Sequence, residues 1–368
     1  MTGGAYDLAA AETETNLKPK PLRRSALIYL GVLVTVGIAT LVGLLWSSAT
    51  DDFDGPRVVN IAPGSTFDAI ADSLKTHGIL KAEGRFRLVA RITGWHRQIK
   101  AGHYLIESGT SVYQLLNILR KGLQTPLRIT VPPGTRVGVV AAVVQNTLGV
   151  DSAAVKAAFT DPVLAEELGT DTLHLFGYML PETIEFFWGT SAEQVVIRLK
   201  QAFDEFFTDE MRARAAELGL SEEEILTLAS IVEWEARIES ERATIAGVYM
   251  NRLRIRMPLQ ADPTVQYAVM KTERSNGPRR LLYSDYKVEH PFNTYLYYGL
   301  PPGPITNPSQ ASITAVLHPE DHDYLFFVAD GSGRHIFSRT LREHNNAANS
   351  YREMMQERRK QQAESESE

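Results

Sequence analysis

The feature that most constrains this chain is an apolar stretch near its N-terminus, residues 26–46, which carries no charged side chain. A helix of this length, at about 1.5 Å per residue, covers the roughly 30 Å hydrocarbon core of a bilayer. Basic residues precede the stretch and acidic residues follow it: Lys18, Lys20, Arg23 and Arg24, then Asp51, Asp52 and Asp54. The preference of Lys and Arg for the cytoplasmic side predicts a single-pass membrane protein with its N-terminus in the cytoplasm. Residues 1–25 would be cytoplasmic, and everything after residue 46 periplasmic or otherwise extracytoplasmic.

The alternative is a cleaved signal peptide, with the small residues Ser47-Ser48-Ala49 near the cut. Signal peptides carry an apolar core of about 7 to 15 residues, and the stretch here is longer, which favours a retained anchor. Residues 47–56 are small and acidic and end in Gly55-Pro56. This composition is typical of a linker.

Composition limits the chemistry of the extracytoplasmic part. The 368 residues are 44% hydrophobic, which allows roughly two to three folded domains. A net charge of −6 lacks the excess of basic residues typical of nucleic-acid-binding proteins, so we expect no nucleic-acid partner. The chain contains no cysteine, which excludes disulfides, a thiol nucleophile and thiolate metal ligands.

A pattern of strand, Pro-Gly-Ser/Thr turn and helix occurs twice. The first copy has a strand at 58–61, Pro63-Gly64-Ser65 as turn and cap, and a helix over 67–77. The second copy has a strand at 128–131, a turn at 133–135 and a helix over 137–148. The second halves also match: 102–105 and 177–180 each precede a Gly-Thr-Ser sequence and another helix.

The two copies predict small α+β units over residues 57–122 and 127–205. Such units look like LysM modules, which hold the sugar backbone of peptidoglycan or chitin. The alternative is a packing scaffold that touches no glycan. This alternative is strongest for the second copy, because helix capping alone would explain why its turn residues are present.

A helix is predicted to start at Ser221, because Glu224 three residues later completes a capping box. A buried stripe is expected at helical spacing: Ile225, Leu228, Ile231 and Val232. Glu235 falls on that stripe, whereas Glu233 lies roughly 200° away around the helix. Burial disfavours an ionised carboxyl group, so we expect the pKa of Glu235 to be raised toward the range of a general acid. The alternative is a solvated glutamate, or one paired with Arg237 or Arg242.

Groups suited to binding sugars follow this helix. Amide and acid side chains occur in Asn251-Arg252-Leu253 and in the Pro-broken segment 257–267. Aromatic side chains that could cover sugar faces follow in segment 290–307: Phe292, Tyr295, Tyr297 and Tyr298. Core packing is the alternative for the tyrosines.

At these residues the chain resembles the endolytic murein transglycosylase family, the YceG-like or MltG proteins. The resemblance extends from the apolar stretch to Asn345. Its strongest motifs are Leu228-Ala229-Ser230-Ile231-Val232-Glu233-Trp234-Glu235, Asn251-Arg252-Leu253, Leu259-Gln260-Ala261-Asp262-Pro263-Thr264-Val265, Asn293-Thr294-Tyr295, Gly299-Leu300-Pro301-Pro302-Gly303-Pro304-Ile305 and Glu343-His344-Asn345. The family's pattern differs from this chain at Phe176, Ile184 and Phe292, which weakens the expectation of sugar contacts there.

The resemblance implies the fold class: an α+β protein with a single N-terminal transmembrane helix, LysM-like modules and a mixed α+β catalytic domain, placed here at residues 206–350. It also implies that the single-pass anchor lies in the plasma (inner) membrane. It implies a lyase that cleaves the bond between N-acetylmuramic acid and N-acetylglucosamine inside nascent peptidoglycan strands and so terminates strand elongation. Peptidoglycan glycan strands would be the substrate, with penicillin-binding proteins or other peptidoglycan synthases as protein partners.

The resemblance also implies the catalytic residue, since the family uses the second Glu of Ile-Val-Glu-x-Glu, which is Glu235 here. That carboxyl group acts as acid and then as base while the muramoyl 6-hydroxyl attacks its own C1, leaving a 1,6-anhydro end. Neither a second catalytic carboxylate nor a metal or cofactor is then expected. We expect five residues to bind substrate or support the site: Glu233, Gln260, Asp262, Asn293 and Tyr295.

Other chemistries have weaker support. Ser284-x-x-Lys287 matches the nucleophile motif of penicillin-binding proteins, but Ser-Asp-Asn and Lys-Thr-Gly are absent from the sequence. His318 and His322 are separated by Pro319, which interrupts any helix, so a metal site is not expected.

Two alternatives remain: a hydrolytic muramidase that pairs Glu235 with Asp262 or Glu233, and an inactive glycan-binding scaffold. The charged tail, residues 351–368, is expected to be a frayed helix followed by disorder, with no chemical role.

Overall fold

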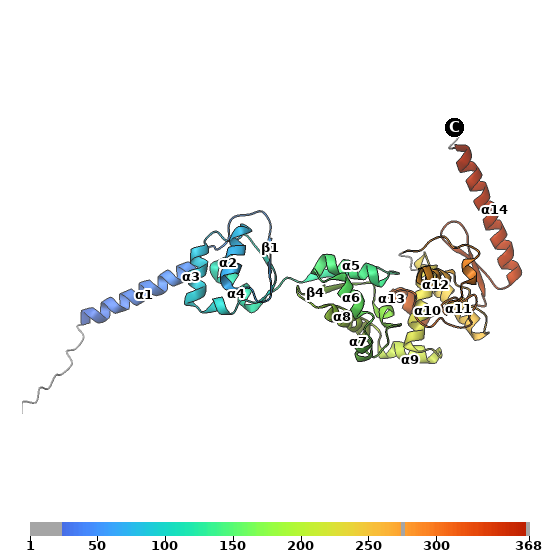
Figure 1. The fold of residues 1–368 in the computed structure, drawn as a ribbon, viewed down its shortest axis with the longest axis horizontal. Coiled ribbons are helices and arrows are strands. Elements are labelled where there is room, and N and C mark those ends of the chain that lie inside the picture. Colours follow the sequence, from blue (N-terminus) through green and yellow to red (C-terminus); the bar gives the residue numbers. More distant parts are fainter. Residues whose placement is uncertain (1–23, 274–276, 366–368) are drawn as a thin grey trace, which may run out of the picture. The chain divides into compact units, whose positions relative to one another are not determined.

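The computed structural model describes residues 24–273 and 277–365 (Figure 1). The chain forms two compact units, Met1–Gln124 and Thr125–Glu368. The expected cytoplasmic tail lies almost entirely outside the described residues. Helix α1 (Arg24–Trp46) contains the apolar span Ala26–Trp46, with a mean hydropathy of 2.4. Among the described helices it alone is long and apolar enough to cross a membrane, as a single-pass anchor or a signal sequence would.

The first unit encloses its own core between a two-stranded sheet and three helices. Its elements are β1 (Arg57–Ile61), α2 (Phe67–Thr76), α3 (Glu83–Ile92), β2 (Gly102–Ile106) and α4 (Val112–Lys121). The strands pair antiparallel, with Arg57 opposite Ile106. Ser111 caps α4 in a capping box with Gln114. The core is formed by alternate strand residues and by the inner faces of the helices.

The segment expected to be a linker, residues 47–56, is in part built into this unit. Ala49 is fully buried in the core, and its backbone N–H donates to Thr110 O over 2.9 Å. Isolated β-bridges pair Ser48 with Ser111 and Thr50 with Leu80. The small side chains that suggested a flexible linker instead allow close packing.

The second unit begins with a similar order of elements, with one additional helix between its two strands. These are β3 (Leu127–Thr130), α5 (Val137–Leu148), α6 (Ser152–Ala158), α7 (Pro162–Glu167), β4 (Thr183–Phe186) and α8 (Ala192–Phe206). Strands β3 and β4 pair antiparallel, with Leu127 opposite Phe186. Ser191 caps α8 in a capping box with Gln194, as Ser111 does for α4.

Two details of the expected repeat are wrong. The second strand of this copy is β4, whereas 177–180 lies at the end of a 3₁₀ turn, Leu175–Tyr178, and just beyond it. The Pro-Gly-Ser/Thr turns also differ in their caps: the Thr66 side chain caps α2, but Arg136, the residue before α5, makes no side-chain cap. The second turn has another partner, since the Thr135 N–H donates to Asn307 Oδ1 over 2.8 Å.

The remaining elements pack on this second copy. They are α9 (Asp209–Glu217), α10 (Glu222–Glu235), α11 (Arg242–Arg254), α12 (Asp262–Glu273), α13 (Gln310–Leu317), β5 (Phe326–Ala329), β6 (His335–Ser338) and α14 (Leu341–Ser365). One hydrophobic core runs from Ile129 to Leu317, so residues 127–205 and 206–350 share a core. Buried Asn307 crosses this junction, because its Nδ2 donates to Pro132 O and Met179 O.

Helix α10 is the central element of the second unit. It starts with the predicted capping box between Ser221 and Glu224. The four residues of the expected stripe are buried, but so is every other residue from Ile225 to Val232. The prediction of a single buried stripe is therefore wrong, because α11 and α13 both pack on α10. The helical-face argument alone does not separate Glu235 from Glu233.

The C-terminal helix α14 continues to Ser365, where the sequence predicted fraying after Tyr351. It packs on β5 and β6 near its start, and further along Tyr351 and Met354 contact the turn between these strands at Gly331. Two of its side chains, Met354 and Met355, are half-buried. This helix contributes to the site described next.

Candidate active site

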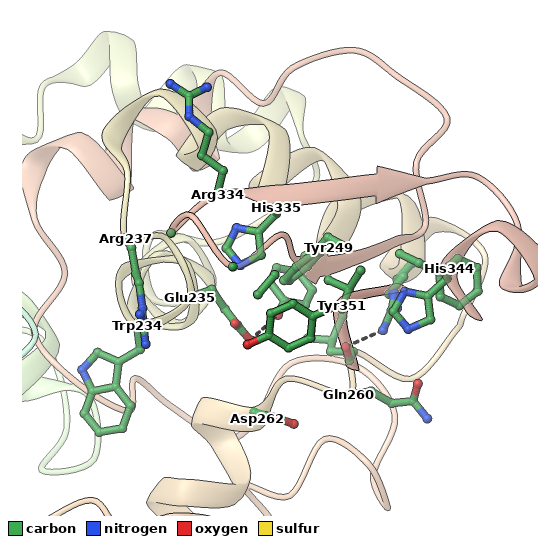
Figure 2. Close-up of a pocket in the computed structure, with 18 of the residues that line it drawn as sticks. Trp234, Glu235, Arg237, Tyr249, Gln260, Asp262, Arg334, His335, His344 and Tyr351 are labelled. Carbon is green, nitrogen blue, oxygen red and sulfur yellow. Dashed lines mark hydrogen bonds between the residues drawn. The ribbon is translucent and has the colours of Figure 1, made fainter. Parts of the chain in front are cut away.

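A cavity of about 740 Å³ opens where the C-terminal end of α10 meets α11, α12, the β5–β6 hairpin and α14 (Figure 2). Glu235, the last residue of α10, lines this cavity. Four of the residues expected from the sequence line this cavity: Glu235, Gln260, Asp262 and Tyr295. Two others, Glu233 and Asn293, do not. The size and mixed lining of the cavity suit a polar polymer segment.

The Glu235 carboxyl group is held by one hydrogen bond from the protein. The Tyr249 hydroxyl group, on the neighbouring helix α11, donates to Glu235 Oε1 over 2.9 Å. No other hydrogen bond to this carboxyl group is found among the described residues, so Oε2 is left for a ligand. Tyr249 is buried, so its position is fixed by packing.

Burial raises the pKa of Glu235 to about 7, and the negative charge of Asp262 acts in the same direction. The Tyr249 hydrogen bond and the positive charge of Arg252 oppose this rise in pKa. The position at the C-terminal end of α10 also disfavours negative charge, because this end of a helix carries a partial negative charge. Glu235 can therefore be protonated or ionised near neutral pH, which a group acting as acid and then base requires.

Two neighbours keep defined protonation states. Burial, together with the charge of Glu235, raises the pKa of Tyr249 well above its ordinary value, so its hydroxyl group remains a donor. Arg252 is anchored from α11 by backbone carbonyls: its guanidinium group donates to Leu325 O over 2.6 Å and to Leu259 O over 2.7 Å. This places a fixed positive charge beside the glutamate.

Asp262 organises the opposite side of the cavity. It begins α12, and its Oδ1 accepts a 2.6 Å hydrogen bond from the Tyr295 hydroxyl group, while its Oδ2 accepts one of 3.2 Å from Tyr286. The rings of Tyr286 and Tyr295 pack edge to face, with centroids 4.8 Å apart. Burial raises the pKa of Tyr286 to about 12, and the charge of Asp262 adds to this effect. Both carboxylate oxygens of Asp262 are thus occupied by hydroxyl donors.

The segment before Asp262 adopts a strained backbone. Gln260 has a φ of +48°, a backbone conformation that residues other than glycine rarely adopt. Its exposed side chain reaches the cavity. Its N–H donates to Thr294 O over 3.2 Å, which ties the segment to the loop before Tyr295. Strain of this kind is concentrated at functional sites.

Asn293 supports this loop from within. It is fully buried, and its Nδ2 donates to Val288 O over 2.9 Å and to Tyr286 O over 3.1 Å. Its Oδ1 accepts from the Tyr295 N–H over 3.0 Å. Asn293 therefore positions the two tyrosines without facing the cavity.

Glu233 has a structural role two residues before Glu235. Its Oε2 accepts hydrogen bonds from Ser309 N over 2.9 Å, from Ser309 Oγ over 2.5 Å and from Ser312 Oγ over 2.7 Å. Its Oε1 pairs with Arg242 over 3.4 Å. The side chain is only 6% exposed. Glu233 thus holds the N-terminus of α13 against α10.

Several cavity residues were not singled out from the sequence. Tyr249 occurs 14 positions after Glu235 without any local signal, because only the packing of α11 against α10 brings the two together. His335 is positioned by Glu241, which accepts a 2.8 Å hydrogen bond from its Nδ1. Residues of α14 also line the cavity, in the segment expected to be a tail: Tyr351, Met355 and Arg358.

The other sequence candidates lie elsewhere. Asp285, inside the Ser-x-x-Lys match, forms an ion pair with Arg279 at 2.7 Å. His322 is bound to backbone, with its Nε2 2.9 Å from Thr244 O. No cluster of three or more potential metal ligands occurs in residues 24–273 or 277–365.

Comparisons with known proteins agree with these observations. The chain is 33% identical over 312 residues to the endolytic murein transglycosylase of Bacillus subtilis, a match that covers 80% of this chain and 84% of the relative. It is 29% identical over 298 residues to the endolytic murein transglycosylase of Streptococcus pneumoniae. That match covers 74% of this chain and 54% of the relative, so the chain spans about half of its length.

A crystal structure of a YceG-like protein from Listeria monocytogenes is also similar. Its TM-score is 0.55 at 30% sequence identity, over 79% of this chain and 98% of that one. The model of the YceG-like family matches residues 59–350, which is most of the chain and includes both Glu235 and Asp262. The chain therefore belongs to the YceG-like family.

Proposed function

We propose that this chain is an endolytic murein transglycosylase. It would cleave the bond between N-acetylmuramic acid and N-acetylglucosamine within nascent peptidoglycan strands and leave a 1,6-anhydromuramoyl end. The names of the relatives support this reaction. The observation that carries the proposal is Glu235 itself, a carboxyl group that lines the cavity and accepts a hydrogen bond from buried Tyr249, and whose pKa is raised by burial to about 7.

In the first step, protonated Glu235 donates its proton to the glycosidic oxygen. The bond between that oxygen and muramoyl C1 breaks, and the departing sugar leaves as a neutral alcohol. Positive charge develops at C1 in an oxocarbenium-like transition state. The Tyr249 hydrogen bond holds Oε1, so that the proton on Oε2 is presented to the substrate.

In the second step, the same carboxylate accepts the proton of the muramoyl 6-hydroxyl group. The oxygen of that hydroxyl forms a bond to C1 of its own sugar, which closes the 1,6-anhydro ring. Glu235 is protonated again and ready for the next bond. Because the nucleophile belongs to the substrate, one carboxyl group serves both steps.

Asp262 suits a supporting role better than that of a second acid or base. Both its oxygens accept hydrogen bonds from tyrosine hydroxyl groups, and its negative charge helps to keep Glu235 protonated. The same charge would stabilise the oxocarbenium-like transition state. Gln260 and Tyr295 supply amide and hydroxyl groups for sugar contacts.

The first unit would hold the glycan and anchor the enzyme. Its two-stranded sheet and three helices are consistent with a LysM-like module, and α1 with a single-pass anchor of the inner membrane. The basic residues before α1 favour a cytoplasmic N-terminus and an extracytoplasmic active site. Penicillin-binding proteins or other peptidoglycan synthases, which make the nascent strands, would be its partners.

Mass analysis of the products from purified peptidoglycan sacculi tests this function. The wild-type protein should release muropeptides with 1,6-anhydro ends, and Glu235→Gln should reduce them by at least about 100-fold, as expected for loss of general acid–base catalysis. Products with reducing ends would indicate a hydrolytic muramidase. Unchanged product formation by Glu235→Gln would contradict the role of Glu235.

A further inference from the structure

We propose that one side of the active-site cavity is a basic wall that binds the carboxylate groups of the peptides carried by muramic acid. The basic wall consists of Arg237, Arg334 and Arg358. The inference rests on the proposed function, because it names the part of a peptidoglycan strand that this side of the site recognises. It concerns side chains that the reaction at Glu235 does not use.

The three arginines reach the cavity from different parts of the chain. Arg237 follows the end of α10, Arg334 belongs to the turn between β5 and β6, and Arg358 lies on α14. All three residues are exposed, and none is paired with a carboxylate within the part of the chain that the structure describes. Arg358 also lies beyond residue 350, where the match to the YceG-like family model ends.

The carboxyl groups that line the cavity form no ion pair with this wall. Among the described residues these carboxyl groups are Glu235 and Asp262. The Asp262 oxygens are occupied by tyrosine hydroxyl groups, and Glu235 is partly protonated near neutral pH. Two further carboxyl groups lie near the wall and are engaged elsewhere: Glu241 accepts hydrogen bonds from the backbone N–H and the ring of His335, and Asp330 accepts hydrogen bonds from Ser332 and from the backbone N–H of Arg334.

The view in Figure 2 separates the two sides of the site, with Arg334 and Asp262 on opposite sides of Glu235. The acidic side carries the tyrosines and the groups suited to sugar hydroxyls. The basic side carries guanidinium groups, which bind carboxylates through paired N–H donors. A substrate with neutral sugars on one side and carboxylates on the other matches this division.

The basic wall is held in place by backbone contacts. Asp330 Oδ1 accepts hydrogen bonds from Ser332 N over 2.7 Å and from Arg334 N over 3.2 Å, which fixes the β5–β6 turn. Arg358 Nη1 donates to Gly331 O in the same turn over 3.2 Å. Helix α14 and the turn are thereby joined, and Arg334 and Arg358 lie on one surface.

Peptidoglycan supplies the matching anions. The sugars themselves are uncharged in strands that carry peptides, because the lactyl group of muramic acid is used in the amide link. The peptides end in free carboxylates and project away from the glycan. A strand lying over Glu235 would therefore present carboxylates beside the sugar that is cut, within reach of long arginine side chains.

The test compares two substrates that differ only in charge: peptide-bearing strands, and the same strands after the peptide carboxylates are converted to amides. We expect the wild-type protein to cleave the native strands with a kcat/KM about tenfold higher, mainly through a lower KM. The double variant Arg334→Gln/Arg358→Gln should lose this preference, because its KM on the native strands should rise to that on the amidated strands. A matched double variant, Arg342→Gln/Arg359→Gln, removes two exposed charges outside the cavity and should keep the preference.

Equal cleavage of both substrates by the wild-type protein would overturn the inference, as would a preference that survives in Arg334→Gln/Arg358→Gln. Retention of the two strand types on immobilised Glu235→Gln gives a second readout that needs no catalysis. If the wild-type protein makes no anhydro product but Glu235→Gln still retains native strands better than amidated ones, the proposed function fails and the basic wall stands. Equal retention of both strand types contradicts the basic wall.

Discussion

The Tyr249 hydroxyl group lies 2.9 Å from Glu235 Oε1 and donates a hydrogen bond to it, which links the middle of α11 to the end of α10. This bond stabilises the ionised carboxyl group, whereas burial and Asp262 stabilise the protonated one. The pKa of about 7 results from this opposition. Substitutions of Tyr249 and of Asp262 should therefore shift the pH dependence of the activity in opposite directions.

The wild-type enzyme should lose kcat/KM as the pH rises through about 7, because Glu235 must start protonated. Tyr249→Phe removes the hydrogen bond that lowers the pKa of Glu235. The decline of kcat/KM with rising pH, which is the alkaline limb of the pH profile, should therefore move to higher pH. The loss of carboxyl orientation should also reduce kcat by about tenfold. Rates of anhydro product formation between pH 5 and 9 measure both effects. A limb that stays in place would show that another group controls it.

Asp262→Asn should move the same limb to lower pH, because it removes the negative charge that helps to keep Glu235 protonated. Asparagine retains one oxygen to accept a hydrogen bond from a tyrosine hydroxyl group, so the site should stay folded. The same pH series, measured together with that of Tyr249→Phe, checks the direction of this shift. A complete loss of activity at every pH would instead indicate that Asp262 takes part directly in the reaction.

Glu235→Gln should be more stable than the wild-type protein at pH 8. The carboxyl pKa is about 7 in the folded protein and 4.5 ordinarily, so the folded state binds more protons between these values. The wild-type stability therefore falls as the pH rises from 4.5 to 7 and then levels off. Glutamine avoids this cost, which is at most about 3 kcal/mol before solvent screening in the cavity. Unfolding in denaturant at pH 4 and pH 8 should show a gain at pH 8 alone.

Glu233→Gln should destabilise the fold and spare the chemistry. The change removes the charge that accepts hydrogen bonds from Ser309 and Ser312 and leaves Arg242 without its partner. We expect a loss of about 2 kcal/mol and a Tm lower by about 4–8 °C. Activity measured well below the Tm should remain near that of the wild type. A Glu233→Gln variant that folds but is inactive would contradict the structural role given to Glu233 and indicate a catalytic one.

The first unit should bind glycan strands without cutting them. Because Ala49 belongs to its core, the fragment to test is 47–124 rather than 57–122. Retention on purified sacculi above that of an unrelated domain of similar charge would support a LysM-like role. Retention no greater than that of the unrelated domain would contradict glycan binding and indicate that the unit acts only as a spacer.

The sequence predicted part of the local structure and part of the site. Apolar periodicity and caps located α1, α2, α4, α5 and α10, because these signals act within a few residues. The pairing of Tyr249 with Glu235 could not be predicted, since it depends on how two helices pack. The same is true of Glu233, whose partners on Ser309 and Ser312 are more than 70 positions away.

Trp234 connects the active site to a segment that carries none of its chemistry. Its Nε1 donates a 2.9 Å hydrogen bond to Gly134 O, in the turn of the second repeat, while its ring lines the cavity beside Glu235. Gly134 has a φ of +58°, and a Cβ there would lie 3.2 Å from Trp234 Nε1. The turn of the second repeat therefore helps to support the active site, and this repeat does not pack as an independent module. An enzyme shortened to residues 206–350 would lose more than half of the buried residues of the shared core, together with the turn that holds Trp234 beside Glu235.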